Sequence, residues 1–163
     1  MIRSLTVLLA VCLTVSLLSG CKSAPPKPAV ARTTVSAAVD VNPNSQGRPS
    51  PVHVRIFQLK ESGPFMAADF FALYDKEPET LGTSLVQRME SDLTPGEQQQ
   101  IEIKIDPATQ VLGVMAEFAD YRNSQWRAIT APIKKKLLVD VIRKKKKVFI
   151  RIDKDRTSIT LGE

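Results

Sequence analysis

Hydrophobic and polar residues alternate along much of this chain, which is the pattern of a β-strand with one buried face. The clearest case is residues 101–106, where isoleucine alternates with glutamate, lysine and aspartate. Similar alternation recurs over residues 33–41, 52–57, 112–118, 148–153 and 159–161, and more weakly over residues 85–91 and 126–133. Strands at these spacings predict a mainly β protein, built as a two-layer antiparallel β-sandwich.

Residues 62–81 break this pattern, because their apolar side chains recur at helical spacing. The residues concerned are Phe65, Met66, Phe70, Leu73 and Tyr74. Proline lies near the start of the segment and again after its end, which suits a helix boundary. We therefore expect one or two helices added to the sandwich. Their aromatic residues form either a binding surface or, as we favour, a cover over an open end of the sandwich.

The N-terminus has the features of a lipoprotein signal peptide. Arg3 supplies a positive charge, residues 4–18 are predominantly apolar, and the run ends at Leu18-Ser19-Gly20-Cys21. The run is too short for a comfortable membrane span. The tetrapeptide resembles the bacterial lipobox, whose cysteine is acylated and becomes the first residue of the mature chain. We expect a signal peptide over residues 1–20 and lipidation of Cys21. The alternative is an uncleaved anchor helix with an incidental cysteine.

The residues that follow suggest how the rest of the chain is organised. Lys22 stands where an aspartate would resemble an inner-membrane retention signal, so we expect an anchor in the outer membrane. Residues 21–32 contain three prolines and no periodic pattern, which is typical of an extended spacer. We expect residues 33–163 to form one periplasmic β-sandwich domain.

Composition limits the chemistry that this domain can perform. The 163 residues include two cysteines and one histidine. Cys12 leaves with the signal peptide and Cys21 carries lipid, so the mature chain has no free thiol. His53 lies on the polar side of a predicted strand, and a single histidine makes a zinc or copper site improbable. We expect no catalytic residue, no metal and no cofactor, although a pair of carboxylates meeting in space stays open.

Positive charge is concentrated near the C-terminus of the chain. Residues 134–156 hold eleven Lys or Arg and three Asp, a net charge of +8 in a chain whose total is +6. Lys134–Lys136 and Arg143–Lys147 are the two densest runs. One interpretation is that these lysines serve only to keep an exposed strand edge soluble. Alternatively, they attract anionic lipid or an acidic partner. Both interpretations remain open. No aromatic residue lies among the lysines to stack on bases, so we expect no nucleic-acid binding.

A long polar loop is predicted between the first two strands. Residues 41–51 contain three prolines, two asparagines and one glycine, far more than a tight hairpin needs. Other segments follow it in a fixed order: Val54-Arg55-Ile56-Phe57-Gln58-Leu59, Ala68-Asp69-Phe70-Phe71, Pro95-Gly96-Glu97 and Trp126-Arg127. With the lipobox, this order resembles the outer-membrane lipoprotein of type VI secretion systems, the TssJ (also SciN or VasD) family.

The resemblance implies a fold, a location and a partner. Members of this family are transthyretin-like β-sandwiches with added helices, lie in the outer membrane facing the periplasm, and bind the periplasmic C-terminal region of TssM. TssL joins them indirectly in the envelope-spanning complex. The resemblance places the contact in the loop after the first strand, with the tip from Asn44 to Arg48 favoured. That loop comprises Asn42, Pro43, Asn44, Ser45, Gln46, Gly47, Arg48, Pro49 and Ser50.

Two other functions remain compatible with the residues alone. The first is a periplasmic lipoprotein that binds an anionic ligand or a cell-wall glycan through the basic C-terminal region. The second is a hydrolase, which would require a carboxylate pair in a cleft. The scarcity of reactive side chains favours a structural tether over both.

Overall fold

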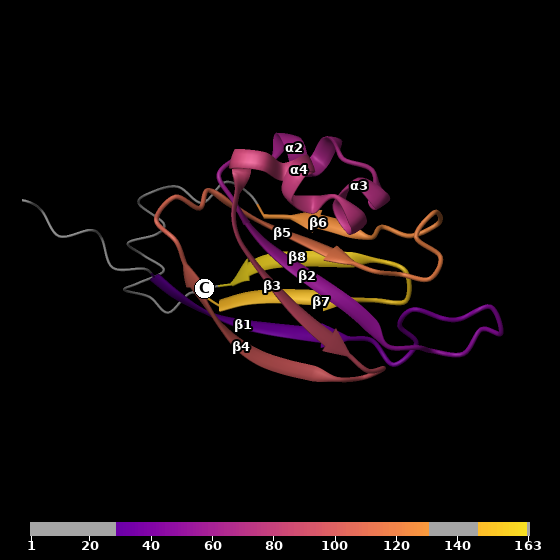
Figure 1. Ribbon diagram of the computed structural model, residues 1–163. Coiled ribbons are helices and arrows are strands. Elements are labelled where there is room, and N and C mark those ends of the chain that lie inside the picture. Colours follow the sequence, from indigo (N-terminus) through magenta and orange to yellow (C-terminus); the bar gives the residue numbers. More distant parts are fainter. Residues whose placement is uncertain (1–28, 131–146, 163) are drawn as a thin grey trace, which may run out of the picture.

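The computed structural model describes residues 29–130 and 147–162, and over these ranges the chain forms two β-sheets with three short helices on one side (Figure 1). The strands are β1 (Ala29–Ala37), β2 (Val52–Leu59), β3 (Leu85–Leu93), β4 (Gln98–Ile105), β5 (Val111–Ala116), β6 (Arg127–Ile129), β7 (Lys147–Ile152) and β8 (Thr157–Gly162). The helices are α2 (Gly63–Ala67), α3 (Phe70–Asp75) and α4 (Glu77–Leu81), followed by a 3₁₀ turn (Gly82–Ser84). The predicted mainly β, two-layer architecture is confirmed.

The strand order differs in one respect from an all-antiparallel sandwich. One sheet has the order β4-β1-β7-β8 and the other β3-β2-β5-β6. Every pair is antiparallel except β1 and β7, which run parallel with Thr33 opposite Val148. Alternation gives the buried face of a strand and not the direction of its neighbour, so the sequence did not reveal this pair. As a result, β1 and β7 begin at the same end of the sandwich.

The alternating residues form the core between the two sheets. Val35, Val54, Ile103, Val114 and Ile150 are almost completely buried in one hydrophobic cluster. Each comes from a different strand, so the cluster joins both layers. The core therefore rests on the period-two pattern seen in the sequence.

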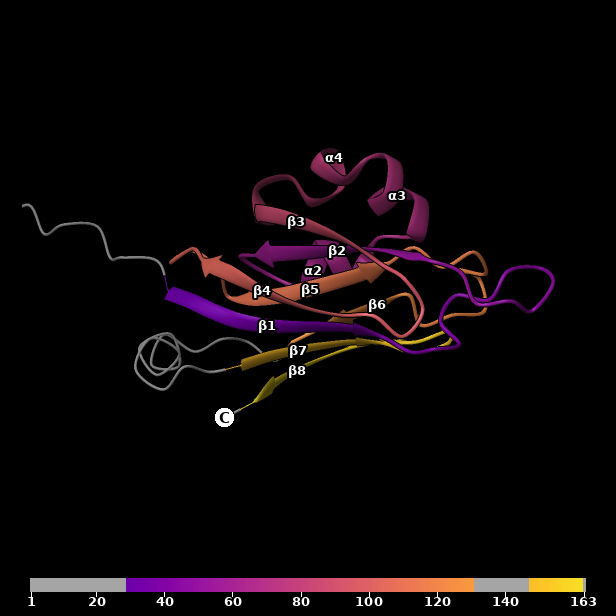
Figure 2. The ribbon, with the colours of Figure 1, turned by 90° about the horizontal axis from the view of Figure 1, so that it is seen from below.

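The predicted helical segment is divided into short helices. Ala68 has extended backbone angles, and the side chain of Asp69 accepts a hydrogen bond from the backbone N–H of Ala72 (2.8 Å), so a new helix begins there. Figure 2 shows the helices on the side of the β3-β2-β5-β6 sheet. Phe65 and Leu73 are buried there against Phe57 and Met115 in a second hydrophobic cluster.

The position of the helices corrects one expectation. They cover the outer face of a sheet, not an open end of the sandwich. The reason is that β5 is buried on both faces and β2 is buried on both faces along its second half, so this sheet needs a second apolar layer. Ile56 to Leu59 are buried at four consecutive positions, so both faces of β2 are covered there.

The first strand lies earlier in the chain than the alternation suggested. It covers Ala29–Ala37 in place of residues 33–41 and so takes four residues from the predicted spacer. Ala31 is buried on the inward face of this strand. The remaining N-terminal residues, and Lys134 to Lys146 of the basic region, lie outside the described residues. Within residues 29–130 and 147–162, no helix is long and apolar enough to cross a membrane.

Candidate functional site

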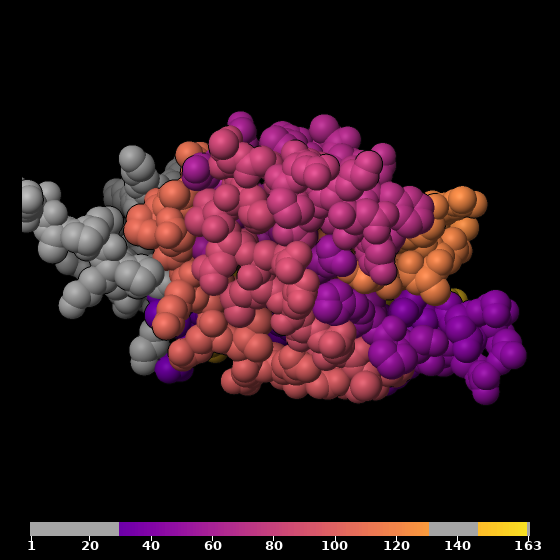
Figure 3. Space-filling view, viewed as in Figure 1, coloured from indigo at the N-terminus to yellow at the C-terminus, as the bar shows by residue number. Residues whose placement is uncertain are grey.

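The loop from Ala38 to Pro51 connects the two sheets and projects from the end of the sandwich. In the space-filling view it extends beyond the rest of that end (Figure 3). Residues 45–49 are exposed, whereas Val41 and Asn42 are buried. The loop therefore has a buried base and an exposed tip.

Asn42 fixes the base of the loop by three hydrogen bonds. Its backbone N–H donates to the carbonyl of Lys154 (3.0 Å), and its side-chain Nδ2 donates to the carbonyl of Pro51 (2.7 Å). Its Oδ1 accepts from the backbone N–H of Ala119 (2.7 Å). Asn42 has a φ of 46°, a left-handed conformation that asparagine tolerates better than most residues. The base is thus tied to the β5–β6 loop and the β7–β8 turn.

Asn44 organises the tip. Its Oδ1 accepts hydrogen bonds from the backbone N–H groups of Gln46 (2.9 Å) and Arg48 (3.0 Å). Its own backbone N–H donates to the carbonyl of Arg48 (2.9 Å), and its carbonyl accepts from Gly47 (2.8 Å). Gly47 completes the turn at φ +74°, where an L side chain is strained. The guanidinium of Arg48 donates to the side chain of Gln46. The tip is therefore shaped by its own bonds.

The structure separates the nine residues predicted for this loop into two roles. Ser45, Gln46, Gly47, Arg48 and Pro49 are exposed. Pro43, Asn44 and Ser50 are half-buried, and Asn42 is 7% exposed. Sequence reasoning grouped Asn42 with the contact residues, but its bonds make it the residue that holds the loop in place. The sequence around Asn42 did not indicate its contacts with Ala119 and Lys154, because these residues lie far along the chain.

A small cavity of about 140 Å³ lies beside the base of the loop. It is bounded by three connecting segments: the β1–β2 loop, the β5–β6 loop and the β7–β8 turn. Its lining residues are Asn42, Pro43, Phe118, Asp120, Asn123, Ser124, Lys154 and Asp155. Pro43 and Phe118 are its apolar lining residues, and the other six carry polar or charged side chains.

Exposed aromatic residues border the same β5–β6 loop. The ring of Phe70 stacks on that of Tyr121 (centroids 4.5 Å apart) and meets that of Trp126 edge to face (5.3 Å). Phe71 and Tyr74 extend this cluster to the surface, with exposed fractions of 52% and 42%. The sequence indicated the residues on α3. It gave no sign that Tyr121 and Trp126 join them.

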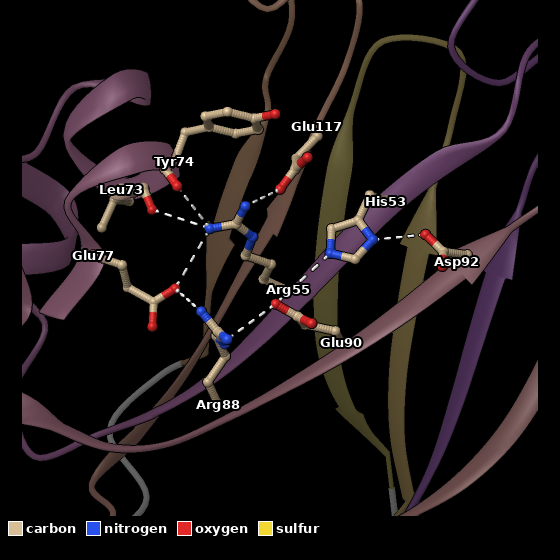
Figure 4. A network of polar contacts seen from close by, with 9 residues as sticks. All are labelled: His53, Arg55, Leu73, Tyr74, Glu77, Arg88, Glu90, Asp92 and Glu117. Carbon is tan, nitrogen blue, oxygen red and sulfur yellow. Dashed lines mark hydrogen bonds and ion pairs between the residues drawn. The ribbon is translucent and has the colours of Figure 1, made fainter.

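A network of charged residues fastens the helices to β2 (Figure 4). The guanidinium of Arg55 lies 2.7 Å from Glu117 and 3.6 Å from Glu77, and it donates to the carbonyls of Leu73 (3.3 Å) and Tyr74 (3.1 Å). Glu77, which is almost fully buried, also accepts from Arg88 (3.0 Å). The hydrogen bond with Glu77 raises the pKa of Arg88 above its usual range. The network therefore holds structure together.

These contacts also bear on the carboxylate pair that the sequence left open. Glu77 and Glu117 both lie beside the guanidinium of Arg55, at 3.6 Å and 2.7 Å, so this pair of carboxylates is held in ion pairs. The neighbours of His53 in this network are two carboxylates, Asp92 at 2.6 Å and Glu90 at 3.9 Å. In residues 29–130 and 147–162, no group of three or more His, Cys, Asp or Glu side chains is placed to hold a metal ion.

Comparisons with known proteins agree with this geometry. The profile of the family described as type VI secretion lipoprotein, VasD, EvfM, TssJ matches residues 29–155. No curated protein sequence matches the chain. Among solved structures, the chain is similar to the T6SS lipoprotein TssJ1 from Pseudomonas aeruginosa, with 29% identity and a TM-score of 0.73 over 83% of this chain and 98% of that one.

Two further structures share the fold. One is Serratia marcescens Lip, described as a membrane-bound component of the type VI secretion system, with 22% identity and a TM-score of 0.68 over 83% of this chain and 97% of that one. The other is described as the T6SS protein TssM C-terminal domain from EAEC, with 22% identity and a TM-score of 0.65 over 81% of this chain and 98% of that one.

Proposed function

This chain belongs to the type VI secretion lipoprotein family, and from that premise we propose that it joins the outer membrane to the periplasmic C-terminal region of TssM. Acyl chains on Cys21 hold it in the outer membrane, with the sandwich in the periplasm. The β1–β2 loop binds TssM, and TssL is attached indirectly through TssM. The protein acts as a tether and not as a catalyst.

The observation that carries this proposal is the position of the loop relative to the anchor. Cys21 precedes β1 by eight residues, and β1 crosses the sandwich before the loop begins. Ala29 and the loop consequently lie at opposite ends of the sandwich (Figure 1). A protein anchored at one end and exposing a binding loop at the other suits contact with a partner that approaches from the inner membrane.

The stiffness of the loop supports the same function. Ordering a flexible loop on binding lowers affinity, because each immobilised side chain and backbone segment loses entropy. Here Asn42 and Asn44 fix both base and tip before any partner arrives. The exposed tip offers a hydroxyl, an amide and a guanidinium, which are groups suited to hydrogen-bonding with another protein.

Calorimetric titration of the TssM periplasmic domain tests the interface. The variant Ser45→Ala/Gln46→Ala/Arg48→Ala keeps Asn44 and the backbone bonds of the turn. We expect binding at least tenfold weaker, about 1.4 kcal/mol, with an unchanged melting temperature. The control variant Gln98→Ala/Gln100→Ala/Lys104→Ala removes three exposed side chains from β4 and should bind normally. Equal affinities for both variants would move the interface away from the loop.

Cell fractionation tests the anchor. Replacing Cys21 with serine removes the acylation site and leaves the sandwich unchanged. Without Cys21 no acyl chain can hold the protein in the bilayer. We therefore expect the variant to leave the membrane fraction and type VI secretion to be abolished. Normal secretion by soluble Cys21→Ser protein would contradict the tether.

A further inference from the structure

A groove of about 630 Å³ crosses the outer face of the β4-β1-β7-β8 sheet, the face that the helices do not cover. The side chains that matter here are Arg32, Thr34, Gln100, Glu102, Lys147 and Phe149. They come from three adjacent strands, so the groove is a feature of the sheet and not of a loop. Lys147 is the first residue of β7 and Arg32 the fourth of β1, so the groove lies near the end of the sheet where these strands begin. Figure 1 shows the β1–β2 loop at the opposite end of the sandwich.

The parallel pairing of β1 and β7 places two cations side by side in this groove. Arg32 is the register partner of Lys147 on one side and of Glu102 on the other. Adjacent strands lie about 4.8 Å apart, and like charges directly opposite each other are destabilising. Among the described residues, no ion pair within 4.0 Å joins Arg32 or Lys147 to a carboxylate. Glu102 offsets one of the two positive charges, and a bound anion would offset the other.

Apolar groups accompany the two cations. Phe149 is 41% exposed, and its ring lies over Gly162, where an added Cβ would approach Cε2 to 2.6 Å. Val30 on β1 is 43% exposed at the same end of the sheet. Cations beside exposed aromatic and aliphatic side chains are typical of surfaces that lie at a membrane interface.

The chain length places this groove within reach of the bilayer. Eight residue steps separate Cys21 from Ala29, and an extended chain spans at most about 3.6 Å per residue, so Ala29 lies within about 29 Å of the acylated cysteine. Arg32 is three residues further along β1, roughly 10 Å. The groove is therefore at the end of the sandwich that the anchor keeps close to the membrane.

We propose that this groove binds the phosphate of an anionic phospholipid headgroup in the membrane that carries the anchor. Arg32 and Lys147 contact the phosphate, and Phe149 lies against the interface. This contact turns the sandwich so that the β1–β2 loop faces away from the bilayer. The inference rests on the lipid anchor of the proposed function, but its test does not require that anchor.

Sedimentation with vesicles tests the groove directly. The chain from residue 21 with Cys21→Ser, which cannot be acylated, is mixed with vesicles of equal parts phosphatidylglycerol and phosphatidylcholine. We expect binding to these vesicles and not to pure phosphatidylcholine. Each cation near an anionic surface contributes roughly a factor of five, so Arg32→Gln/Lys147→Gln should bind about 25-fold more weakly.

A matched variant separates the groove from net charge. Arg151→Gln/Lys154→Gln also removes two positive charges, but from the other end of β7 and the turn that follows it. Its binding to the vesicles should weaken less than threefold. An equal loss in both double variants, no loss in the first, or equal binding to phosphatidylcholine would each overturn the proposal. Circular dichroism should show both variants folded; if the first unfolds, the single variants should each lose about fivefold.

Binding of the TssM domain distinguishes this inference from the proposed function. Arg32→Gln/Lys147→Gln should bind TssM as the unmodified chain does. If it loses TssM binding instead, the groove belongs to the partner interface and the lipid assignment is wrong. If the unmodified chain does not bind TssM at all, the tether fails while the vesicle result stands.

Discussion

The side-chain oxygen of Asn42 accepts a 2.7 Å hydrogen bond from the backbone N–H of Ala119, a residue 77 positions later in the chain. The amide nitrogen of the same side chain donates to the carbonyl of Pro51. One side chain thus closes the β1–β2 loop on itself and attaches it to the β5–β6 loop. The exposed tip depends on this buried amide for its position.

Replacing Asn42 with alanine should destabilise the fold by about 1–3 kcal/mol, because it removes the two side-chain hydrogen bonds to Pro51 and Ala119 and such a bond contributes about 0.5–1.5 kcal/mol. It should also weaken TssM binding by loosening the loop. Asn42→Gly loses the same hydrogen bonds but tolerates φ 46°, so it should be about 1 kcal/mol more stable than Asn42→Ala. Urea unfolding measures both differences. Equal stabilities for the alanine and glycine variants would show that backbone strain is absent at this position.

The alternation of side chains predicted the sandwich because that pattern follows from burial on one face. Ile101, Ile103 and Ile105 lie on one side of β4, and the last two are buried as the pattern requires. The direction of neighbouring strands leaves no comparable pattern, so the parallel β1–β7 pair was missed. Phe57 and Met115 lie on the outer face of their sheet and are buried by the helices. Alternation along a strand does not predict that a second layer covers its outer face.

The candidate site shows the same division. Proline, asparagine and glycine content predicted a stiff exposed loop, because those residues favour turns for local reasons. Asn44 and Gly47 act within the loop and fit that logic. Asn42 makes hydrogen bonds with Ala119 and Lys154, and Arg32 lies opposite Lys147 in the strand register. Contacts of this kind, between residues far apart in the chain, become visible only in the three-dimensional structure.

Glu97 should make the stability of the β3–β4 turn depend on pH. Its carboxylate accepts hydrogen bonds from the backbone N–H and hydroxyl of Thr94 and from the amide of Gln99. The bond from the Thr94 backbone N–H is the main cause that lowers the pKa of Glu97 to about 2. A lowered pKa gives stability that is present above pH 4.5 and is lost as pH falls toward 2.

Nuclear magnetic resonance should locate the titration midpoint of the Glu97 carboxyl near pH 2. The advantage in stability over Glu97→Gln should be full at pH 7 and should shrink between pH 4.5 and pH 2. A midpoint near 4.5 would mean that the turn bonds do not persist in solution.

Glu77 should be one of the most sensitive charged residues in the described structure. Its side chain is 4% exposed, and its Oε2 pairs with Arg88 and Arg55. Arg55 keeps Glu117 and the half-exposed Arg88 keeps Glu90, so Glu77→Ala removes one charged hydrogen bond and one ion pair. It should lose about 1.5–3 kcal/mol. Glu79 lies exposed on the same helix, and Glu79→Ala should change stability by less than about 0.5 kcal/mol. Thermal unfolding compares the two, and similar losses would rule out the network as the cause.

Gln58 connects the two sheets at the end of the sandwich away from the β1–β2 loop. It is 1% exposed, and its Nε2 donates to the carbonyl of Lys104 (2.9 Å). Its Oε1 accepts from the backbone N–H of Asp106 (2.9 Å) and the hydroxyl of Thr109 (2.8 Å). Gln58→Leu has a similar volume but leaves these groups unsatisfied, so it should cost about 2–4 kcal/mol.

The same variant tests whether the two ends of the sandwich act independently. Gln58 is the seventh of eight residues in β2, so the length of the strand separates it from the loop. Gln58→Leu should therefore bind TssM with unchanged affinity at a temperature where it is fully folded. Gln87→Leu changes the exposed partner of Gln58 and should lose less than about 1 kcal/mol. If Gln58→Leu loses affinity in proportion to stability, the loop depends on the whole core and not on its own hydrogen bonds.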